Sequence, residues 1–217
     1  MKQIDIWNKN FSEKKYNYAE YSNRCSWLME YIALFQEMNN ETVVDLGCGD
    51  GYNTMYLYNA GVRNIIACDI ASSALEEVKH LTDNKVETCC FDMSKEIPFA
   101  NSSVGIVVAS LSIQYFSLND SIKIFKKLYN SLKPGGYLIF RVNNLNQYYR
   151  NKTDDTVREL GHHYYESING KNKFYYDEND IDMVRGEFKL ISLKEVEFIF
   201  ADESKLAYEV VFQKNLC

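Results

Sequence analysis

Three glycines stand at alternate positions directly after a short run of β-branched residues. The segment VVDLGCGDGYNTMYL, residues 43–57, places Gly47, Gly49 and Gly51 between a strand pattern and a helix pattern. Glycine tolerates positive φ and lets the main chain approach a ligand closely. The spacing is G-x-G-x-G, because Tyr52 stands where the dinucleotide fingerprint needs its third glycine, and no phosphate-binding lysine follows. The turn therefore fits a nucleoside-bearing ligand better than a dinucleotide or a triphosphate.

Acidic residues also stand at the ends of predicted strands. Asp69 ends the second predicted strand, about twenty residues beyond the turn, where a carboxylate can accept both hydroxyls of a ribose. Asp92 ends the third strand, where it can accept the amine of a purine while Phe91 and Met93 flank the ring. Asp45 adds further negative charge. So much carboxylate disfavours a phosphate-bearing cofactor, whereas an adenosine that carries a sulfonium and an ammonium satisfies every constraint.

Alternating strand and helix patterns position these residues. Short, continuous apolar strands that alternate with helices predict a parallel sheet covered by helices on both faces. The expected strands are 42–46, 64–69, 86–91, 104–110 and 137–142, and the expected helices are 23–38, 52–59, 72–80 and 117–132. A polar, tyrosine-rich stretch then runs to about residue 176. Beyond it we expect a helix at 178–185 and two long strands, 188–198 and 206–213, that form an antiparallel edge.

The motifs VVDLGCGDG, ACDI, FDMSKEIPF, VVASLSIQYF and LKPGGYLIFRV, in this order, resemble the class I S-adenosylmethionine-dependent methyltransferases, most of all the small single-domain bacterial ones. The resemblance covers residues 40–142, and the tail from Tyr175 resembles the last helix and reversed edge strands of that family. It implies a Rossmann-like, doubly wound α/β fold with a mostly parallel seven-stranded sheet, an antiparallel edge strand and helices on both faces. Gly105 departs from the family, which often has an acid at the start of the fourth strand.

The chain is predicted to form one domain, residues 1–217, because it has no internal repeat and no linker-like segment. We expect four parts within it. They are an aromatic N-terminal arm and helix (1–39), a cofactor-binding core (40–143), a substrate-side insert or lid (144–176), and the last helix with the edge strands (177–217).

The resemblance implies S-adenosylmethionine as cofactor, S-adenosylhomocysteine as product, and no metal. The glycine turn would approach the methionine moiety with its main chain, Asp45 would support the ammonium, and Asp69 would bind the ribose. The simpler alternatives are that Asp69 caps the next helix and that Asp92 forms a turn with Ser94. The implied cofactor-binding residues are Tyr16, Tyr21, Asp45, Gly47, Cys48, Gly49, Asp69, Ile70, Asp92, Met93, Ser110 and Leu111.

On the substrate side, Gln114 or Tyr115 would line the outer wall of the pocket. His162 and His163 lie in GHHYYES, between the fifth strand and the last helix, and His163 is our candidate for a catalytic base. A base is needed only when the methyl acceptor is a hydroxyl or a protonated amine. The alternative is that both histidines are solvated loop residues.

Aromatic residues crowd the N-terminal arm and the insert. They fit a lid that excludes water and offers π faces to a cation, or else a packed cluster or a protein interface. The residues concerned are Trp7, Phe11, Tyr16, Tyr18, Tyr21, Tyr148, Tyr149, Tyr164, Tyr165, Tyr175 and Tyr176.

Composition excludes several functional classes. The chain has 24 basic against 30 acidic residues, a net charge of −6, and no basic block, which argues against binding to nucleic acid or to an anionic membrane. The N-terminus lacks the apolar core of a signal peptide. The six cysteines include no C-x-x-C pair, which argues against zinc and structural disulfides, so we expect a cytoplasmic protein with reduced thiols. Cys68, Cys89 and Cys90 read as small buried hydrophobic residues.

Three functions remain at this point. The leading one is methyl transfer to a small molecule, since the chain lacks the N/D-P-P-Y motif of amine-modifying DNA methylases and the Pro-Cys of cytosine methylases. The second is a non-catalytic protein that binds S-adenosylmethionine or S-adenosylhomocysteine as a regulatory or partner subunit. The third, a nicotinamide-dependent oxidoreductase, is disfavoured by Tyr52. The sequence leaves the methyl acceptor and the oligomeric state open.

Overall fold

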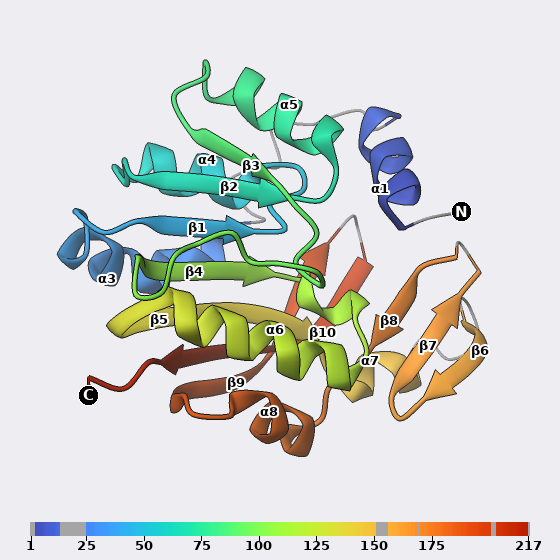
Figure 1. Cartoon of the computed structure of the whole chain (residues 1–217). Helices are drawn as coiled ribbons and strands as arrows, with labels where there is room; N and C mark the ends of the chain where they lie inside the picture. The colour runs from blue at the N-terminus through green and yellow to red at the C-terminus, as the bar shows by residue number, and fades with distance from the viewer. Residues whose placement is uncertain (1–2, 14–24, 151–155, 169, 201–202, 217) are drawn as a thin grey trace.

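A central sheet of seven strands organises the computed structural model, which describes residues 3–13, 25–150, 156–168, 170–200 and 203–216 (Figure 1). The strands are β1 (Val43–Leu46), β2 (Ile65–Asp69), β3 (Glu87–Cys90), β4 (Val104–Ser110), β5 (Leu132–Asn143), β9 (Lys189–Phe200) and β10 (Glu203–Gln213). Their order is β3-β2-β1-β4-β5-β10-β9. Strand β10 runs antiparallel to β5 and β9, and the other pairs are parallel. The predicted fold is confirmed, with the reversed strand one position inside the edge.

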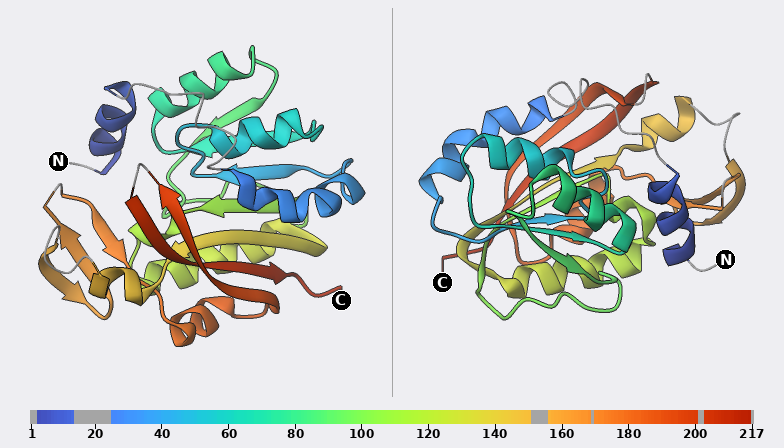
Figure 2. Two further views of the ribbon diagram at one scale, coloured as in Figure 1. Left: turned by 180° about the vertical axis from the view of Figure 1, so that it is seen from behind. Right: turned by 90° about the horizontal axis from the view of Figure 1, so that it is seen from above.

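Helices cover both faces of this sheet. The helices of the first face are η2 (Ser26–Tyr31), α3 (Ile32–Glu37), α4 (Tyr52–Asn59) and α5 (Ser72–Leu81). Those of the second face are α6 (Leu118–Ser131) and α8 (Glu178–Arg185). Figure 1 shows α6 and α8 in front of the sheet, and the view from behind in Figure 2 shows α3 and α4. The expected helix at 23–38 is thus a 3₁₀ segment followed by a short α-helix.

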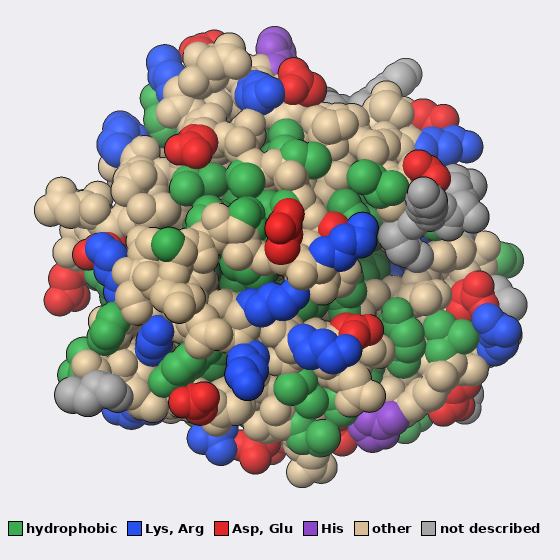
Figure 3. Space-filling view, viewed as in Figure 1, with side chains coloured by type: hydrophobic (Ala, Val, Ile, Leu, Met, Phe, Trp, Pro, Cys, Tyr) green, Lys and Arg blue, Asp and Glu red, His purple; other side chains and the backbone are tan. Residues whose placement is uncertain are grey.

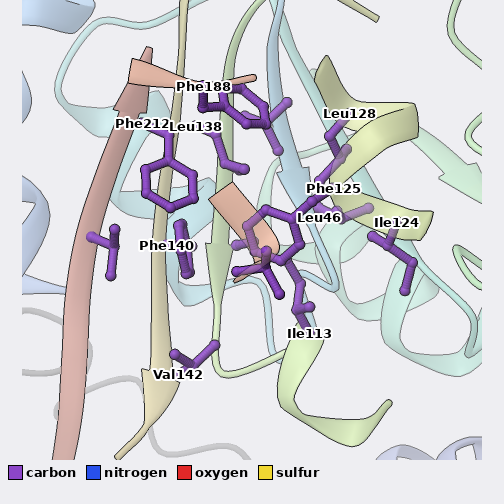
Figure 4. Close-up of a cluster of buried hydrophobic side chains, with 14 of the residues drawn as sticks. Leu46, Ile113, Ile124, Phe125, Leu128, Leu138, Phe140, Val142, Phe188 and Phe212 are labelled. Carbon is purple, nitrogen blue, oxygen red and sulfur yellow. The ribbon is translucent and has the colours of Figure 1, made fainter. Parts of the chain in front are cut away.

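Two buried clusters fix these layers. Between the sheet and α6, the rings of Phe125 and Phe140 meet edge to face at 5.1 Å, and Phe212 joins them from β10 (Figure 4). On the opposite face Leu57, Leu75 and Val78 are buried, as predicted from their helical spacing; this face forms a second cluster. Because both faces of the central strands β1 and β4 are covered, these strands are largely buried and mostly apolar.

Several elements beyond the carboxyl ends of the parallel strands were not predicted. They are α1 (Gln3–Ser12), η3 (Ile113–Tyr115), α7 (Leu145–Arg150) and the strands β6 (Thr156–Gly161), β7 (Tyr164–Ser167) and β8 (Asn172–Phe174). The last three strands form a separate antiparallel sheet in the order β6-β7-β8. Figure 1 shows α1 and this small sheet on the side to which the parallel strands point.

The surface shown in Figure 3 carries acidic and basic side chains interspersed with one another. None of the helices in the described ranges is long and apolar enough to cross a membrane. The described cysteines are free thiols. Cys68 is buried as expected and Cys89 partly so, but the prediction for Cys90 is wrong: its side chain is exposed, because β3 is an edge strand with both ends open to solvent.

Candidate functional site

A cavity of about 860 Å³ opens at the carboxyl ends of the parallel strands. Its walls come from α1, from the turn after β1, from the ends of β2 to β5, and from α7, β7, β8 and the tips of β9 and β10. Ligand pockets commonly measure about 300–1,000 Å³, so this volume is large enough for a sizeable ligand. In an open α/β sheet this edge is where ligands bind.

The glycine turn forms one wall of the cavity. Gly47 has φ +72°, and a Cβ atom there would lie 2.3 Å from the Cβ of Ser112. The hydroxyl of Ser112 donates a 2.7 Å hydrogen bond to the Leu46 carbonyl, which holds Ser112 against the turn. Gly49 has φ +49° and faces the ring of Phe11, which lies 3.2 Å from the position of a Cβ. Gly47 therefore cannot be replaced without moving the neighbouring loop.

Asp69 lines the cavity beside this turn. Its Oδ2 accepts a 2.9 Å hydrogen bond from the Gly49 amide, and its Oδ1 accepts a hydrogen bond of the same length from the Ala71 amide. Burial raises the pKa of Asp69, although these amide bonds act against the rise. The carboxylate thus holds the glycine turn and the start of α5 together. Each oxygen keeps a second acceptor site, so the predicted ribose contact remains open to it.

Asp92 also lines the cavity and forms the turn that we considered as the simpler alternative. Its Oδ1 accepts hydrogen bonds from the Ser94 amide (3.0 Å) and hydroxyl (2.6 Å), and its Oδ2 lies 3.1 Å from the Lys95 ammonium. Partial burial raises the pKa of Asp92, but the bonds from Ser94 and Lys95 outweigh it and the pKa lies below its ordinary value. The contact with a purine amine stays a prediction.

Asp45 is fully buried and is not among the residues that line the cavity. Its Oδ2 accepts a 2.6 Å hydrogen bond from the Thr54 hydroxyl, whereas Oδ1 is buried without a partner in the described part of the chain. Burial raises the pKa of Asp45 to about 7. The predicted support of an ammonium would therefore act from beneath the turn.

The other predicted residues of the described ranges that line the cavity are Cys48, Ile70, Met93, Ser110, Leu111, Gln114 and Tyr115. Leu111 has φ +54°, a strained conformation of the kind that clusters at functional sites. Burial raises the pKa of the Cys48 thiol well above its ordinary value and that of Tyr115 to about 12, so neither group is ionised near neutral pH.

His162 and His163 lie outside this cavity wall. His162 Nε2 and His163 Nδ1 bond to the two oxygens of the Asp180 carboxylate at 2.9 and 2.8 Å. The three groups place potential metal-ligating atoms within 4.8 Å of one another. Because both rings turn to α8, this geometry does not support the expectation that His163 is a catalytic base or that His162 lies on the substrate side.

Helix α1 takes the place expected for the N-terminal arm. Trp7, Asn10 and Phe11 line the cavity, and the Trp7 ring meets Tyr115 edge to face at 4.7 Å. The Nδ2 of Asn10 is buried without a partner within the described ranges. Tyr16 and Tyr21, predicted to contact the cofactor, lie outside the described residues.

Sequence reasoning missed Arg141 and Gln147, which line the opposite wall. Arg141 follows the apolar run YLIF and shows no motif of its own, and Gln147 lies in a polar stretch without a clear period. Arginine inside a buried strand is unusual unless it is paired with an acid. The position of Arg141 in an apolar strand was therefore the one sequence signal that could have identified it.

Residues 44–140 match the family model described as "Methyltransferase domain". The match begins in β1, spans the glycine turn and both acids that line the cavity, and ends in β5. Residues 44–140, somewhat less than half of the chain, are thus similar to methyltransferase domains.

Proteins similar to this segment include enzymes of different activities. A carboxy-S-adenosyl-L-methionine synthase from Shewanella woodyi is 34% identical over 105 residues, which cover 45% of this chain and 42% of that protein. A malonyl-[acyl-carrier protein] O-methyltransferase from Pectobacterium atrosepticum is 31% identical over 112 residues, covering 50% of this chain and 41% of that protein. The chain thus matches less than half the length of these curated relatives.

The fold extends further than the sequence match. A solved S-adenosylmethionine-dependent methyltransferase from Anabaena variabilis is 16% identical, covers 98% of this chain and 93% of its own, and superposes with a TM-score of 0.69. At this identity the likeness concerns the fold alone.

The cavity fits the cofactor that this similarity implies. The glycine turn lines the cavity, and Asp69 presents a buried carboxylate beside it. The unpaired amide of Asn10 faces the same space from α1. These groups offer hydrogen-bond partners for ribose hydroxyls and for an amino acid moiety.

Proposed function

We propose that this domain transfers a methyl group from S-adenosylmethionine to a small molecule bound in the same cavity. One observation carries the proposal: a single cavity continues from the acid-lined glycine turn to a second wall built from Arg141, Gln147 and aromatic side chains. A cofactor at the turn and an acceptor at the second wall would therefore share one enclosed space. Its volume, about 860 Å³, favours a small acceptor.

Residues of the turn and of α1 would hold the cofactor. Asp69 would bind the ribose, and the amides of the turn would contact the amino acid part. When bound, S-adenosylmethionine supplies a methyl group on a sulfonium centre, and the rest of the cofactor leaves as a neutral thioether. Trp7, Phe11 and Tyr115 would exclude water from the transfer. Since no anion needs stabilisation, alignment dominates, and alignment alone contributes about 7–11 kcal/mol in favourable cases.

No histidine is among the described residues that line the cavity. An acceptor that already has a free electron pair, such as a thiolate or a neutral amine, needs no base. The same observation favours the second candidate, a protein that binds the cofactor or its product without catalysis. Detection of a methylated product separates the two.

The decisive experiment has two steps. Isothermal titration calorimetry should show binding of S-adenosylhomocysteine and none of NAD; tight NAD binding without a response to S-adenosylhomocysteine would overturn the proposal. A metabolite pool incubated with the protein and methyl-labelled cofactor should then yield a labelled product by mass spectrometry. Cofactor binding with no labelled product from any pool would support the non-catalytic alternative.

A further inference from the structure

Gln147 presents an unpaired hydrogen-bond donor to the cavity. Its side chain is 3% exposed, and its Oε1 accepts a 2.6 Å hydrogen bond from the Leu206 amide. That bond fixes the orientation of the side-chain amide, because only the oxygen can accept. The Nε2 is buried and has no partner in the described ranges, yet Gln147 belongs to the cavity wall. A buried donor without a partner is unfavourable, so a ligand that accepts a hydrogen bond from it would remove this cost.

Arg141 presents a second donor on the same wall. It is 8% exposed, and its Nε and Nη2 donate to Glu209 Oε2 at 2.8 and 2.6 Å. The guanidinium lies over the Trp27 ring at 4.5 Å and the Phe198 ring at 4.9 Å. Tyr31 donates to the other oxygen of Glu209 at 2.6 Å. Arg141 is thus held rigidly, and within the described residues its Nη1 makes no hydrogen bond.

The two donors lie over the same stretch of the β9–β10 ribbon. Phe198, which contacts the guanidinium of Arg141, is paired with Lys205 across the two strands. Leu206, which binds Gln147, is the next residue of β10. Phe198 and Lys205 also line the cavity. Arg141 and Gln147 thus line the same part of the cavity wall.

The charge of this wall is opposite to that of the cofactor wall. Its lining residues include the cations Arg141, Lys171, Lys173 and Lys205 and the acid Glu203, which pairs with Lys205; a further acid, Asp120, lines the cavity from the first turn of α6. Lys171 lies over the Trp7 ring at 4.2 Å, on the rim toward α1. The cofactor wall carries Asp50, Asp69 and Asp92. Such a separation of charge attracts an anion to one end of the cavity and a cation to the other.

We infer that the methyl acceptor carries a carboxylate and that Arg141 and Gln147 bind it. This inference rests on the proposed function and names the substrate class of the same cavity. A planar carboxylate has two oxygens, one for the guanidinium and one for the amide, and hydrogen bonds with a charged partner are the stronger kind. Glu209 already neutralises part of the charge of Arg141, which favours a monoanion over a doubly charged phosphate. Tyr148 and Tyr175 line the adjoining wall and suit an apolar or aromatic body.

The test uses the wild-type protein saturated with S-adenosylhomocysteine and three probes that differ only in the head group. Phenylacetate should bind at least tenfold more tightly than phenylacetamide or benzylphosphonate when measured by calorimetry or ligand-observed NMR. Equal affinities for the acid and the amide, tighter binding of the phosphonate, or no binding of phenylacetate would overturn the inference. Failure of S-adenosylhomocysteine to bind would instead overturn the proposed function.

Gln147→Glu is the matching variant, because it keeps the acceptor for the Leu206 amide and replaces the free donor with a carboxylate. The new carboxylate would occupy the place of the ligand beside Arg141, so phenylacetate should bind at least tenfold more weakly. Gln36→Glu makes the same charge change at an exposed site of α3 and should leave the affinity unchanged. A loss of phenylacetate binding in both variants, or in neither, would contradict the inference.

The carboxylate of the cofactor itself is the competing ligand for these donors. Gln147→Glu should change the affinity for S-adenosylhomocysteine by less than twofold. If that affinity falls tenfold while binding of 5′-methylthioadenosine, which lacks the amino acid part, stays constant, the two donors hold the cofactor and the inference is wrong. Arg141 itself is a poor target for substitution, because its loss would leave Glu209 buried with no cationic partner.

Discussion

The two walls of the cavity are built in different ways. The cofactor wall comes mainly from the segment between Gly47 and Met93, in which a residue at the end of each strand or directly after it lines the cavity. The acceptor wall combines β5, α7, β7, β8 and the tips of β9 and β10. Its central contacts join Arg141 to Glu209 and Gln147 to Leu206, across 68 and 59 positions of the chain.

This difference has a consequence for specificity. The family match, residues 44–140, contains the cofactor wall and stops one residue before Arg141. The acceptor wall therefore depends on elements outside the shared core, where substitution can change the substrate without disturbing the glycine turn.

The largest effect is expected from Gly47→Ala on the cofactor wall. The added Cβ would stand 2.3 Å from Ser112 Cβ at a positive φ, and the backbone strain alone costs about 1–3 kcal/mol. We expect at least a 100-fold loss of affinity for S-adenosylhomocysteine in calorimetry, together with a lower Tm. Gly61→Ala is the matched control, since φ is +97° but nothing lies within 4 Å of the new atom. Equal losses of affinity in both variants would show that strain, and not the turn, is responsible.

Asp69→Ala should follow, with affinity for S-adenosylhomocysteine weakened by about 1.5–3 kcal/mol, the range for hydrogen bonds to a charged group. Asp69→Asn keeps the size of the side chain and one acceptor, and should fall between this variant and the wild type. Because burial raises the pKa of Asp69, the calorimetry is repeated at several pH values, and a higher pH favours the ionised carboxylate. An unchanged affinity in Asp69→Ala would mean that Asp69 only connects the turn to α5.

The elements that form the cofactor wall could largely be predicted from the sequence. Strand β4 and helices α4 and α8 have the predicted limits, because local apolar periods and glycine or aspartate boundaries define them. The residues that follow β1, β2 and β3 could be placed at one edge because parallel strands end there together. Nothing beyond short-range sequence order was needed for that inference.

The acceptor wall could not be predicted in the same way. Strands β6 to β8 are short and mostly polar, so they lack an apolar period, and their pairing depends on contacts with the rest of the domain. Arg141 and Gln147 acquire their orientation from Glu209 and Leu206, which are far away in the chain. His163 shows the converse: its residue type suggests catalysis, but its partner, Asp180, lies 17 positions away in α8 and turns it from the cavity.

Asp45→Asn tests the buried charge beneath the cofactor wall. The pKa of Asp45 is raised to about 7 from an ordinary 3.8, so the native state takes up a proton between those values and stability falls as the pH rises from about 4 to 7. The variant does not titrate there. Its free energy of unfolding relative to the wild type should therefore rise by about 4 kcal/mol between pH 4 and pH 8 in urea titrations. A pH-independent difference would place the pKa of Asp45 near its ordinary value.

Asp180→Asn should have the smallest effect. It tests how much the hydrogen bonds of Asp180 stabilise the acceptor side of the domain. Asp180 accepts from the Asp177 amide at 3.0 Å and from both histidines. Burial alone would raise the pKa of Asp180, but these hydrogen bonds lower it by more, so the pKa lies below its ordinary value. The ionised carboxylate therefore stabilises the fold above its ordinary pKa, and this contribution is lost as the pH falls through the lowered value. We expect a loss of about 1 kcal/mol at pH 7 that shrinks in strong acid.

Affinity for S-adenosylhomocysteine should stay unchanged in Asp180→Asn, because neither Asp180 nor the two histidines line the cavity. His163→Ala is the companion variant: it removes one partner of Asp180 and should likewise reduce stability without affecting cofactor binding. The sharper measurement is turnover of the labelled product. If His163→Ala retains cofactor affinity and most of its stability but loses turnover, the histidine reaches the acceptor in a conformation other than the one described here. In that case the acceptor wall includes the loop between β6 and β7.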